Sequence, residues 1–223
     1  METILNIVEY IGVISFTVSS TVIAIRKRTD IIGALIFALL TSFGGGFIRD
    51  LTLGITPRIL SLEKNTYLLL TCIAVSTICF VFAFIPKTAK LLSKHGHGFF
   101  IEFTDAIGLS VFCVVGMNVA IEVSGGDNFV LLIFCGCITG VGGGMLRDIC
   151  SMEIPFILRK HIYLTPTLIG SVFYALTYKH LTQIPSMLIS IAIIIAIRTL
   201  AIIFKWNLPI PKSDFDSIKD EID

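Results

Sequence analysis

Long apolar runs constrain this chain more than any other feature of its sequence. Seven stretches are apolar enough, and near enough to about 20 residues, to cross a hydrocarbon layer of about 30 Å. They are Thr3–Ile25, Ile31–Leu53, Tyr67–Ile85, Ile101–Val123, Phe129–Met152, Tyr163–Tyr178 and Ile184–Phe204. The chain is 55% hydrophobic and only 15% charged, whereas about 25% of the residues of a soluble domain are charged. The sequence therefore predicts an all-α membrane protein with seven transmembrane helices.

The basic residues divide unevenly between the two ends of these spans. One side carries Arg26, Lys27, Arg28, Lys87, Lys90, Lys94, Arg159, Lys160, Lys205, Lys212 and Lys219. The other side carries Arg58, Lys64 and Lys179. Because cytoplasmic loops hold the excess of Lys and Arg, the N-terminus is predicted to lie outside and the C-terminus in the cytoplasm, with residues 205–223 as a polar cytoplasmic tail.

The same unusual motif occurs twice. TSFGGGFIRD at Thr41–Asp50 and TGVGGGMLRD at Thr139–Asp148 each place three glycines and an Arg-Asp pair inside an apolar run. Further matched pairs are Glu9 with Asp105, Gly12 with Gly108, Phe16 with Phe112, Pro57 with Pro155 and Tyr67 with Tyr163. The chain therefore contains an internal repeat.

Each repeat contains three predicted spans, so the second repeat must enter the membrane from the opposite side. The sequence predicts two inverted three-helix repeats, residues 3–85 and 101–180, followed by a seventh helix at 184–204. Together they form one transmembrane domain within residues 1–204. Transport proteins use this construction, with their sites near the midplane on discontinuous helices.

The glycine triplets are predicted to break the second and fifth spans. Each interior glycine costs about 1 kcal/mol of helix stability relative to alanine, and freed carbonyl groups are tolerated only where they line water or contact an ion. Carbonyl and hydroxyl oxygens could then coordinate a partly dehydrated cation. The candidate ion-pathway residues are Gly44, Gly45, Gly46, Gly142, Gly143, Gly144, Thr41, Ser42 and Thr139. Close helix packing alone is the alternative interpretation.

Charged residues inside the spans are the second candidate group. Arg49 and Arg147 are costly in lipid and are expected to face the bundle interior or a water-filled cavity. Asp50 and Asp148 follow them directly, so we expect each Asp to lie on another helix face and to pair with a different span. These four residues are predicted to set pore electrostatics or gating; structural ion pairs or snorkelling arginines are the alternative.

Three other charged residues lie within the predicted spans. Glu9 and Asp105 occupy equivalent places near the start of each repeat, where they are expected to pair with the arginines or to cap their helices. Arg198, in the seventh span, is expected to extend towards the membrane interface.

Several classes of protein are excluded by what the sequence lacks. There is no P-loop and no Ser-His-Asp set, and the cysteines lack the spacing of a zinc site. The spacing of His95 and His97 can bind a metal, but two histidines in a loop usually do not. There is no basic tract with interleaved aromatic residues, as nucleic-acid binding would require. We therefore expect neither an enzyme nor a bound cofactor nor a resident metal, and no nucleic-acid partner; only K⁺ or Na⁺ in transit is expected.

The doubled GGGxxRD motif, with a predicted three-span unit around each copy, resembles the TRIC family of trimeric intracellular cation channels, in its prokaryotic branch. The stretch Ala24–Asp30 and the stretch Asp105–Gly108 also resemble the family. The resemblance implies a homotrimer in the inner or plasma membrane, surrounded by lipid and without a known protein partner. It also implies one potassium-permeable pore in each protomer, where kinked second and fifth helices meet at the glycine triplets.

Two alternatives to a passive channel remain open from the sequence. A carrier for glycine or a similar small solute would also use inverted repeats and broken helices, because helix ends can bind both charges of a zwitterion. A membrane scaffold would use the glycines only for packing.

Overall fold

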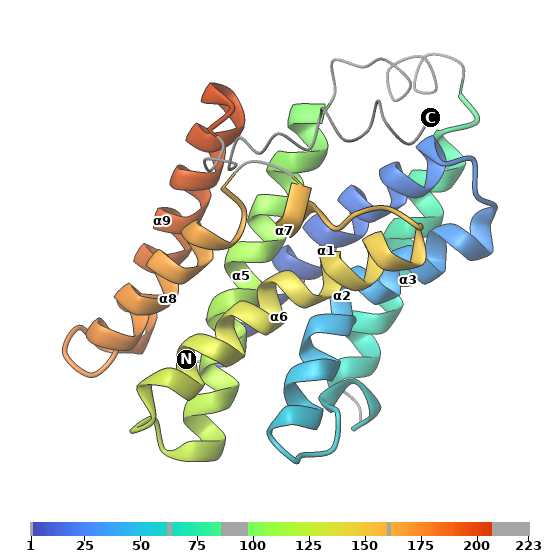
Figure 1. Ribbon diagram of the computed structural model, residues 1–223. Helices are drawn as coiled ribbons and strands as arrows, with labels where there is room; N and C mark the ends of the chain where they lie inside the picture. Colours follow the sequence, from blue (N-terminus) through green and yellow to red (C-terminus); the bar gives the residue numbers. More distant parts are fainter. Residues whose placement is uncertain (1, 62–63, 86–97, 160–161, 207–223) are drawn as a thin grey trace, which may run out of the picture.

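The computed structural model describes residues 2–61, 64–85, 98–159 and 162–206, and these residues form helices joined by short connections (Figure 1). The elements are α1 (Glu2–Arg26), α2 (Ile31–Thr52), the short 3₁₀ helix η1 (Arg58–Leu60), α3 (Lys64–Phe82), α5 (Gly98–Ser124), α6 (Phe129–Cys150), α7 (Phe156–Arg159), α8 (Leu164–Thr177) and α9 (Gln183–Phe204). No strand occurs among the described residues. The all-α prediction is therefore confirmed; the predicted tail beyond Trp206 lies outside the described residues.

Within the described residues, six helices are long and apolar enough to cross a membrane: α1, α2, α3, α5, α6 and α9. The sixth predicted span corresponds to α8, an apolar helix of only 14 residues. At 1.5 Å per residue α8 is about 21 Å long, shorter than a hydrocarbon layer of about 30 Å. The predicted boundaries of the long helices agree with the structure to within three residues.

Matching caps explain why α2 and α6 begin where the sequence predicts. The Asp30 carboxylate accepts a hydrogen bond from the Gly33 N–H (2.7 Å), and the Asn128 side-chain oxygen accepts one from the Leu131 N–H (3.0 Å). Such caps satisfy backbone donors that the first turn of a helix leaves without a partner. The two helices that carry the glycine motifs thus start in the same way.

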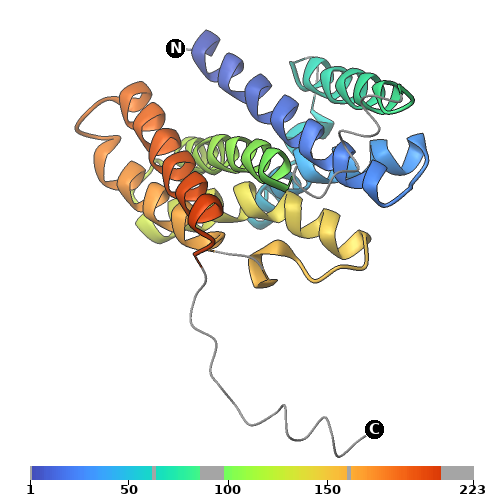
Figure 2. The same cartoon turned by 90° about the horizontal axis from the view of Figure 1, so that it is seen from above.

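Helix α5 forms the centre of the molecule. Figure 2 shows α5 with α1 on one side and α6 on the other, and with α8 and α9 beside it. The rings of Phe16 in α1 and Phe112 in α5 stack with their centroids 5.3 Å apart. Gly108 lies directly against Phe16, since a Cβ atom there would come within 2.2 Å of the ring. This core joins the first unit (α1–α3) to the second unit (α5, α6 and α8).

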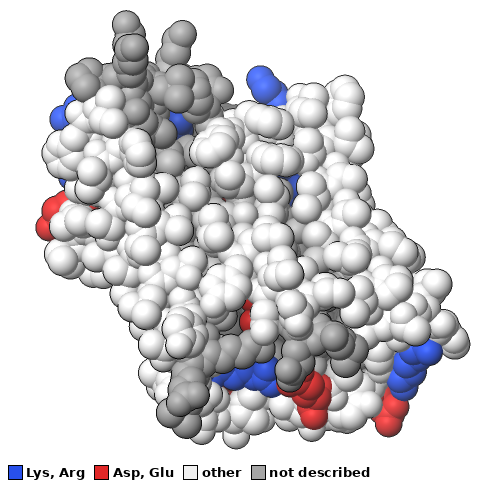
Figure 3. Space-filling view, turned by 180° about the vertical axis from the view of Figure 1, so that it is seen from behind, with Lys and Arg blue, Asp and Glu red and all other residues white. Residues whose placement is uncertain are grey.

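The outer surface has the polarity of a membrane protein. Figure 3 shows charged residues gathered towards the two ends of the molecule, while the broad middle of that face is almost free of them. Large apolar side chains are exposed along the long helices, among them Ile32, Leu51 and Val130. Burial in lipid, rather than in a larger protein core, accounts for such a surface.

Candidate functional site

Helices α2 and α6 cross at their glycine triplets with the backbones in contact. A Cβ atom added to Gly45 would lie 2.2 Å from the carbonyl oxygen of Thr139, and one added to Gly143 would lie 2.0 Å from the carbonyl oxygen of Thr41. The contact is reciprocal, because the middle glycine of each motif touches the threonine that begins the other. No residue with a side chain fits at either position without moving the helices apart.

The prediction that these glycines break their helices is wrong. α2 is helical from Ile31 to Thr52 and α6 from Phe129 to Cys150, with both triplets inside (Figure 1). The helix keeps its backbone groups paired, as an apolar environment demands, and the close approach of the partner backbone compensates for the low helix propensity of glycine. The packing interpretation therefore describes the triplets in this structure.

The hydroxyl groups near the crossing bond mainly to protein. Thr41 donates to the Phe37 carbonyl oxygen (2.7 Å) and Thr139 to the Cys135 carbonyl oxygen (2.5 Å), each one turn back in its own helix. The Ser42 hydroxyl lies 3.2 Å from the Thr17 hydroxyl of α1. All three residues are buried. The three hydroxyl oxygens can still accept hydrogen bonds. Their hydroxyl protons already have an acceptor in the protein or lie within reach of one.

The first charge cluster lies at the end of α2. The Arg49 guanidinium donates from Nε and Nη2 to Asp50 Oδ1 (2.8 and 2.6 Å), and only 4% of Arg49 and 1% of Asp50 is exposed. The second carboxylate oxygen of Asp50 accepts the backbone N–H of Arg58 at 2.7 Å. Asp50 therefore ties its neighbouring arginine to the segment that follows the helix.

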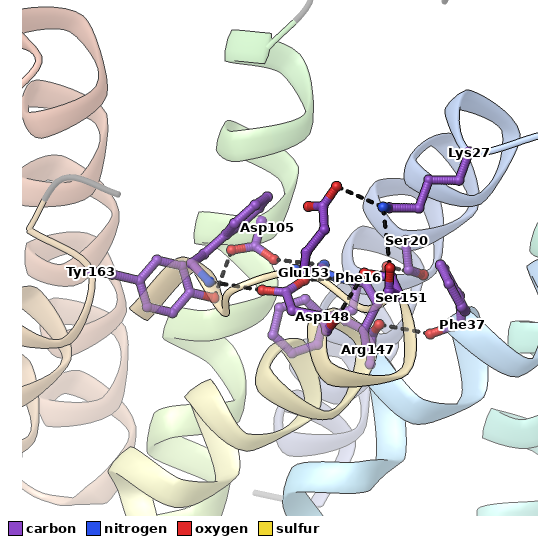
Figure 4. Close-up of polar contacts among 12 residues, drawn as sticks. Phe16, Ser20, Lys27, Phe37, Asp105, Arg147, Asp148, Ser151, Glu153 and Tyr163 are labelled. Atoms are coloured by element: carbon purple, nitrogen blue, oxygen red, sulfur yellow. Dashed lines mark hydrogen bonds and ion pairs between the residues drawn. The ribbon is translucent and has the colours of Figure 1, made fainter. Parts of the chain in front are cut away.

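The second charge cluster repeats this arrangement at the end of α6 and extends it (Figure 4). Arg147 Nε donates to Asp148 Oδ1 at 2.9 Å, and Asp148 Oδ2 accepts the N–H of Phe156, also at 2.9 Å. Arg147 Nη1 also lies 3.4 Å from Asp105 of α5, and the Tyr163 hydroxyl donates to the other oxygen of Asp105 at 2.8 Å. Arg147 and Asp105 are completely buried. A buried arginine with two carboxylates has the partners that its charge requires.

The expectation that Asp50 and Asp148 pair with other spans is therefore wrong. It assumes a helix that continues, whereas each Asp lies in the last turns of its helix and is anchored by an N–H eight residues later. The long arginine side chain then reaches its sequence neighbour. The expected pairing of Asp105 with Arg147 is confirmed.

The expectation for Arg198 is also wrong, because only 2% of it is exposed. Its guanidinium lies over the Tyr163 ring, 4.5 Å from the centroid, and donates to the Ile162 carbonyl oxygen at 3.2 Å. A planar guanidinium stacks well on an aromatic face. Arg198 therefore holds α9 against the second charge cluster instead of extending to the interface.

A small cavity of about 70 Å³ adjoins the first charge cluster. It is called the outer cavity because it lies towards the end of α2, which the sequence predicts to face outside. Its polar and glycine lining includes Glu9, Ser42, Gly46, Arg49, Arg58 and Thr139. It thus brings together one side of the glycine crossing and the Arg49–Asp50 pair. A cavity of this size with several polar groups in its wall can hold a few water molecules.

A larger pocket of about 290 Å³ lies at the end of the molecule where α1 and α6 finish. It is called the inner pocket because the sequence predicts that this end faces the cytoplasm. Its lining includes Arg26, Lys27, Ile101, Glu102, Glu153 and Phe156. The Phe156 ring also packs against Arg147, 5.2 Å from the guanidinium carbon. Phe156 therefore stands between this pocket and the second charge cluster.

Sequence reasoning missed the roles of Phe156 and Tyr163. The signal that could have located the first is the proline pair: Pro57 and Pro155 each precede the residue whose N–H anchors the motif aspartate. Proline favours a tight turn after a helix. The match of Tyr67 with Tyr163 did not indicate the role of Tyr163, because the two matched residues differ in burial. Of Tyr67 64% is exposed, and of Tyr163 only 3%.

Together these features define a multi-pass α-helical membrane protein with a glycine crossing between two buried Arg-Asp clusters. A family model described as "Glycine transporter" matches residues 6–84 and again 102–179. A UPF0126 membrane protein of Vibrio cholerae is 32% identical over 213 residues, covering 94% of this chain and 82% of that protein. The UPF0126 inner membrane protein YadS of Escherichia coli K12 is 30% identical over 211 residues, covering 93% and 95%.

Solved structures of TRIC channels also match this chain. One, described as "Structural basis for conductance through TRIC cation channels", superposes with a TM-score of 0.79 at 34% identity and covers 93% of this chain and 97% of that one. A TRIC trimeric intracellular cation channel orthologue from Rhodobacter sphaeroides gives a TM-score of 0.77 at 30% identity, covering 91% and 98%. The chain belongs to the TRIC family, the family that this glycine-transporter model describes.

Proposed function

We propose that this protein is a cation channel that conducts monovalent cations, chiefly potassium, through a pore in each protomer. The observation that carries the proposal is the match, over 93% of the chain at 34% and 32% identity, to structures described as TRIC cation channels. One of these was determined in 0.5 M KCl. The absence of a catalytic or metal constellation from the sequence agrees with a channel rather than an enzyme.

The route we propose runs beside the glycine crossing, from the outer cavity to the inner pocket. Direct contact between Gly45 and Gly143 and the opposing carbonyl groups leaves no room for an ion between the glycines themselves. Ser42, Gly46 and Thr139 line the outer cavity and offer hydroxyl and carbonyl oxygen next to that contact. Oxygen ligands of this kind can replace part of the hydration shell of a potassium ion.

The arginines do not oppose such a route, because carboxylates accompany them. Arg49 is paired with Asp50, and Arg147 with both Asp105 and Asp148. Each guanidinium charge is thereby neutralised within its cluster. An unpaired arginine beside a pore would repel cations.

The assembly and topology belong to the same proposal. We infer two repeats of opposite orientation, seven membrane-crossing helices with α8 as the short sixth, an N-terminus outside and a cytoplasmic C-terminus. The reciprocal Gly45 and Gly143 contacts and the double match of the family model support the repeats. The orthologue described as trimeric supports a homotrimer.

A carrier for glycine is the second candidate function. The description of the family model names glycine, and the outer cavity holds both acidic and basic side chains, including Glu9 and Arg58. A small cavity with both charges suits a small zwitterion. Saturable uptake would distinguish a carrier from a pore.

Purified protein in liposomes tests the two functions in parallel. We expect potassium flux that follows the ion gradient and the membrane potential, and no saturable uptake of labelled glycine. Protein-free liposomes and liposomes with an unrelated membrane protein are the controls. Saturable glycine uptake without potassium flux would show that the channel proposal is wrong.

A further inference from the structure

Two ion pairs join the two units, one at each end of the molecule. Lys27, just beyond the end of α1, pairs with Glu153 in the segment after α6 at 2.6 Å. Arg58, in η1 after α2, pairs with Glu122 near the end of α5 at 2.7 Å. Each pair joins the first helix of one unit to the segment that follows the Arg-Asp motif of the other unit. The residue at the first helix is basic in the first pair (Lys27) and acidic in the second (Glu122).

The Lys27 pair lies at the end of the molecule where Phe156 packs on the second charge cluster. Lys27 and Glu153 both line the inner pocket, and the Lys27 ammonium also lies 3.4 Å from the Ser151 carbonyl oxygen (Figure 4). The segment it holds, Ser151–Phe156, is anchored at its other end by the Phe156 N–H on Asp148. Phe156 then separates the inner pocket from Arg147. Lys27 thus fixes, from outside the second unit, the segment that covers the second charge cluster.

The Arg58 pair lies at the opposite end, beside the outer cavity. Arg58 lines the outer cavity, which already reaches Ser42 and Thr139 beside the glycine crossing. The position that matches Phe156, directly after Pro57, is occupied by Arg58 and therefore carries no aromatic ring. Breaking this pair should therefore change access to the crossing little.

We propose that the Lys27–Glu153 ion pair is a clasp that keeps the Ser151–Phe156 segment, and with it Phe156, closed over the inner end of the ion route, so that releasing the pair raises conduction. This inference rests on the proposed function. Lys27 and Glu153 are partly exposed, with 26% and 36% of their side chains accessible. A pair of that kind shifts a closed-to-open equilibrium by about two- to fivefold.

The sign of the effect separates a clasp from simple electrostatics. Lys27→Met removes a positive charge from the mouth of the pocket and Glu153→Gln a negative one. If mouth charge alone mattered, the first change would raise cation flux and the second would lower it. A clasp predicts that both raise potassium flux by about two- to fivefold, and that exchanging the charges, Lys27→Glu with Glu153→Lys, returns flux towards the wild-type value.

Two matched controls belong to the experiment. Arg28→Met removes the same charge one residue beyond Lys27, and Glu122→Gln breaks the corresponding pair at the outer end. Each should change flux by less than about twofold. Hydrogen exchange of peptides that cover residues 151–158 provides a readout independent of flux, and exchange should be faster in Lys27→Met than in the wild-type protein.

The outcomes are distinguishable. A wild-type protein without potassium flux overturns the proposed function and this inference together. Wild-type flux with opposite effects of Lys27→Met and Glu153→Gln, or with neither changed, overturns the clasp alone. Unchanged hydrogen exchange of residues 151–158 in Lys27→Met also overturns it, because Lys27 would then not hold the segment.

Discussion

The two Arg-Asp clusters share one motif and have opposite surroundings. Arg49 adjoins a cavity, whereas Arg147 is completely buried beneath Phe156. The internal bonds are alike, down to the N–H anchor on each aspartate. The difference comes from what is packed on the outside: Tyr163 and Arg198, the latter from α9, cover the second cluster. A repeated motif therefore specifies the bonds within a site, while residues outside the motif decide how completely the site is buried.

The strongest test of this comparison removes each arginine in turn. Arg147→Met leaves Asp105 and Asp148 without their cationic partner and should cost about 3–5 kcal/mol of stability. Arg49→Met should cost less, because it leaves one buried carboxylate without its cationic partner rather than two, and Asp50 lines a cavity that is large enough to hold water. Thermal unfolding of the detergent-solubilised protein measures both. Equal losses of stability in the two variants would contradict the difference in burial between the two clusters.

The tyrosine pair sharpens the comparison with a smaller change. Tyr163→Phe removes one hydroxyl from Asp105 and should destabilise the protein by about 1.5–3 kcal/mol, the range for a hydrogen bond to a charged group. Tyr67→Phe, at the matching position of the first unit, is the control and should have no measurable effect, since 64% of Tyr67 is exposed. A similar loss in both variants would contradict the assigned asymmetry.

The glycine crossing is where the two units should behave alike. Gly45→Ala and Gly143→Ala each place a Cβ atom against a backbone carbonyl oxygen and should each cost about 1–3 kcal/mol through overpacking. Gly98→Ala is the control, since a Cβ atom there meets nothing within 4 Å. Clearly unequal losses at Gly45 and Gly143 would show that the crossing is not reciprocal.

An exposed ion pair gives the smallest expected effect. Asp127 pairs with Lys179 at 2.8 Å outside the long helices, and this contact lowers the pKa of Asp127 below its usual value. Its contribution to stability is therefore present above the ordinary pKa of an aspartate and is lost as the pH falls through the lowered pKa. Asp127→Asn should therefore lower the unfolding temperature only slightly at neutral pH, and its difference from the wild-type protein should disappear as the pH falls below ~4. A large loss at neutral pH would contradict a fully hydrated pair.

The sequence predicts the helices well because their signal is local. Apolar length locates the spans, and Asp30 and Asn128 mark where α2 and α6 begin. The glycine motifs also identify the segments that meet. The prediction that the glycines break their helices was wrong, because helix propensity describes an isolated helix and omits the backbone of the partner that compensates for it.

The charge clusters were predicted only in part for a similar reason. Helical periodicity separates Arg49 from Asp50, but it does not include the chain beyond the helix end, where an N–H fixes the carboxylate. The burial of Arg198 depends on where Tyr163 lies, and those residues are far apart in the sequence. Contacts of that kind follow from the assembled fold and leave no mark in the local pattern.

The contact between α2 and α6 has a mechanical consequence. Helices that interlock through side chains must change rotamers before one can slide along the other. At Gly45 and Gly143 the contact is between main-chain atoms, which have no rotamers to change. The contacts of Gly45 and Gly143 therefore add no rotamer barrier to a small sliding or rotation of one helix against the other.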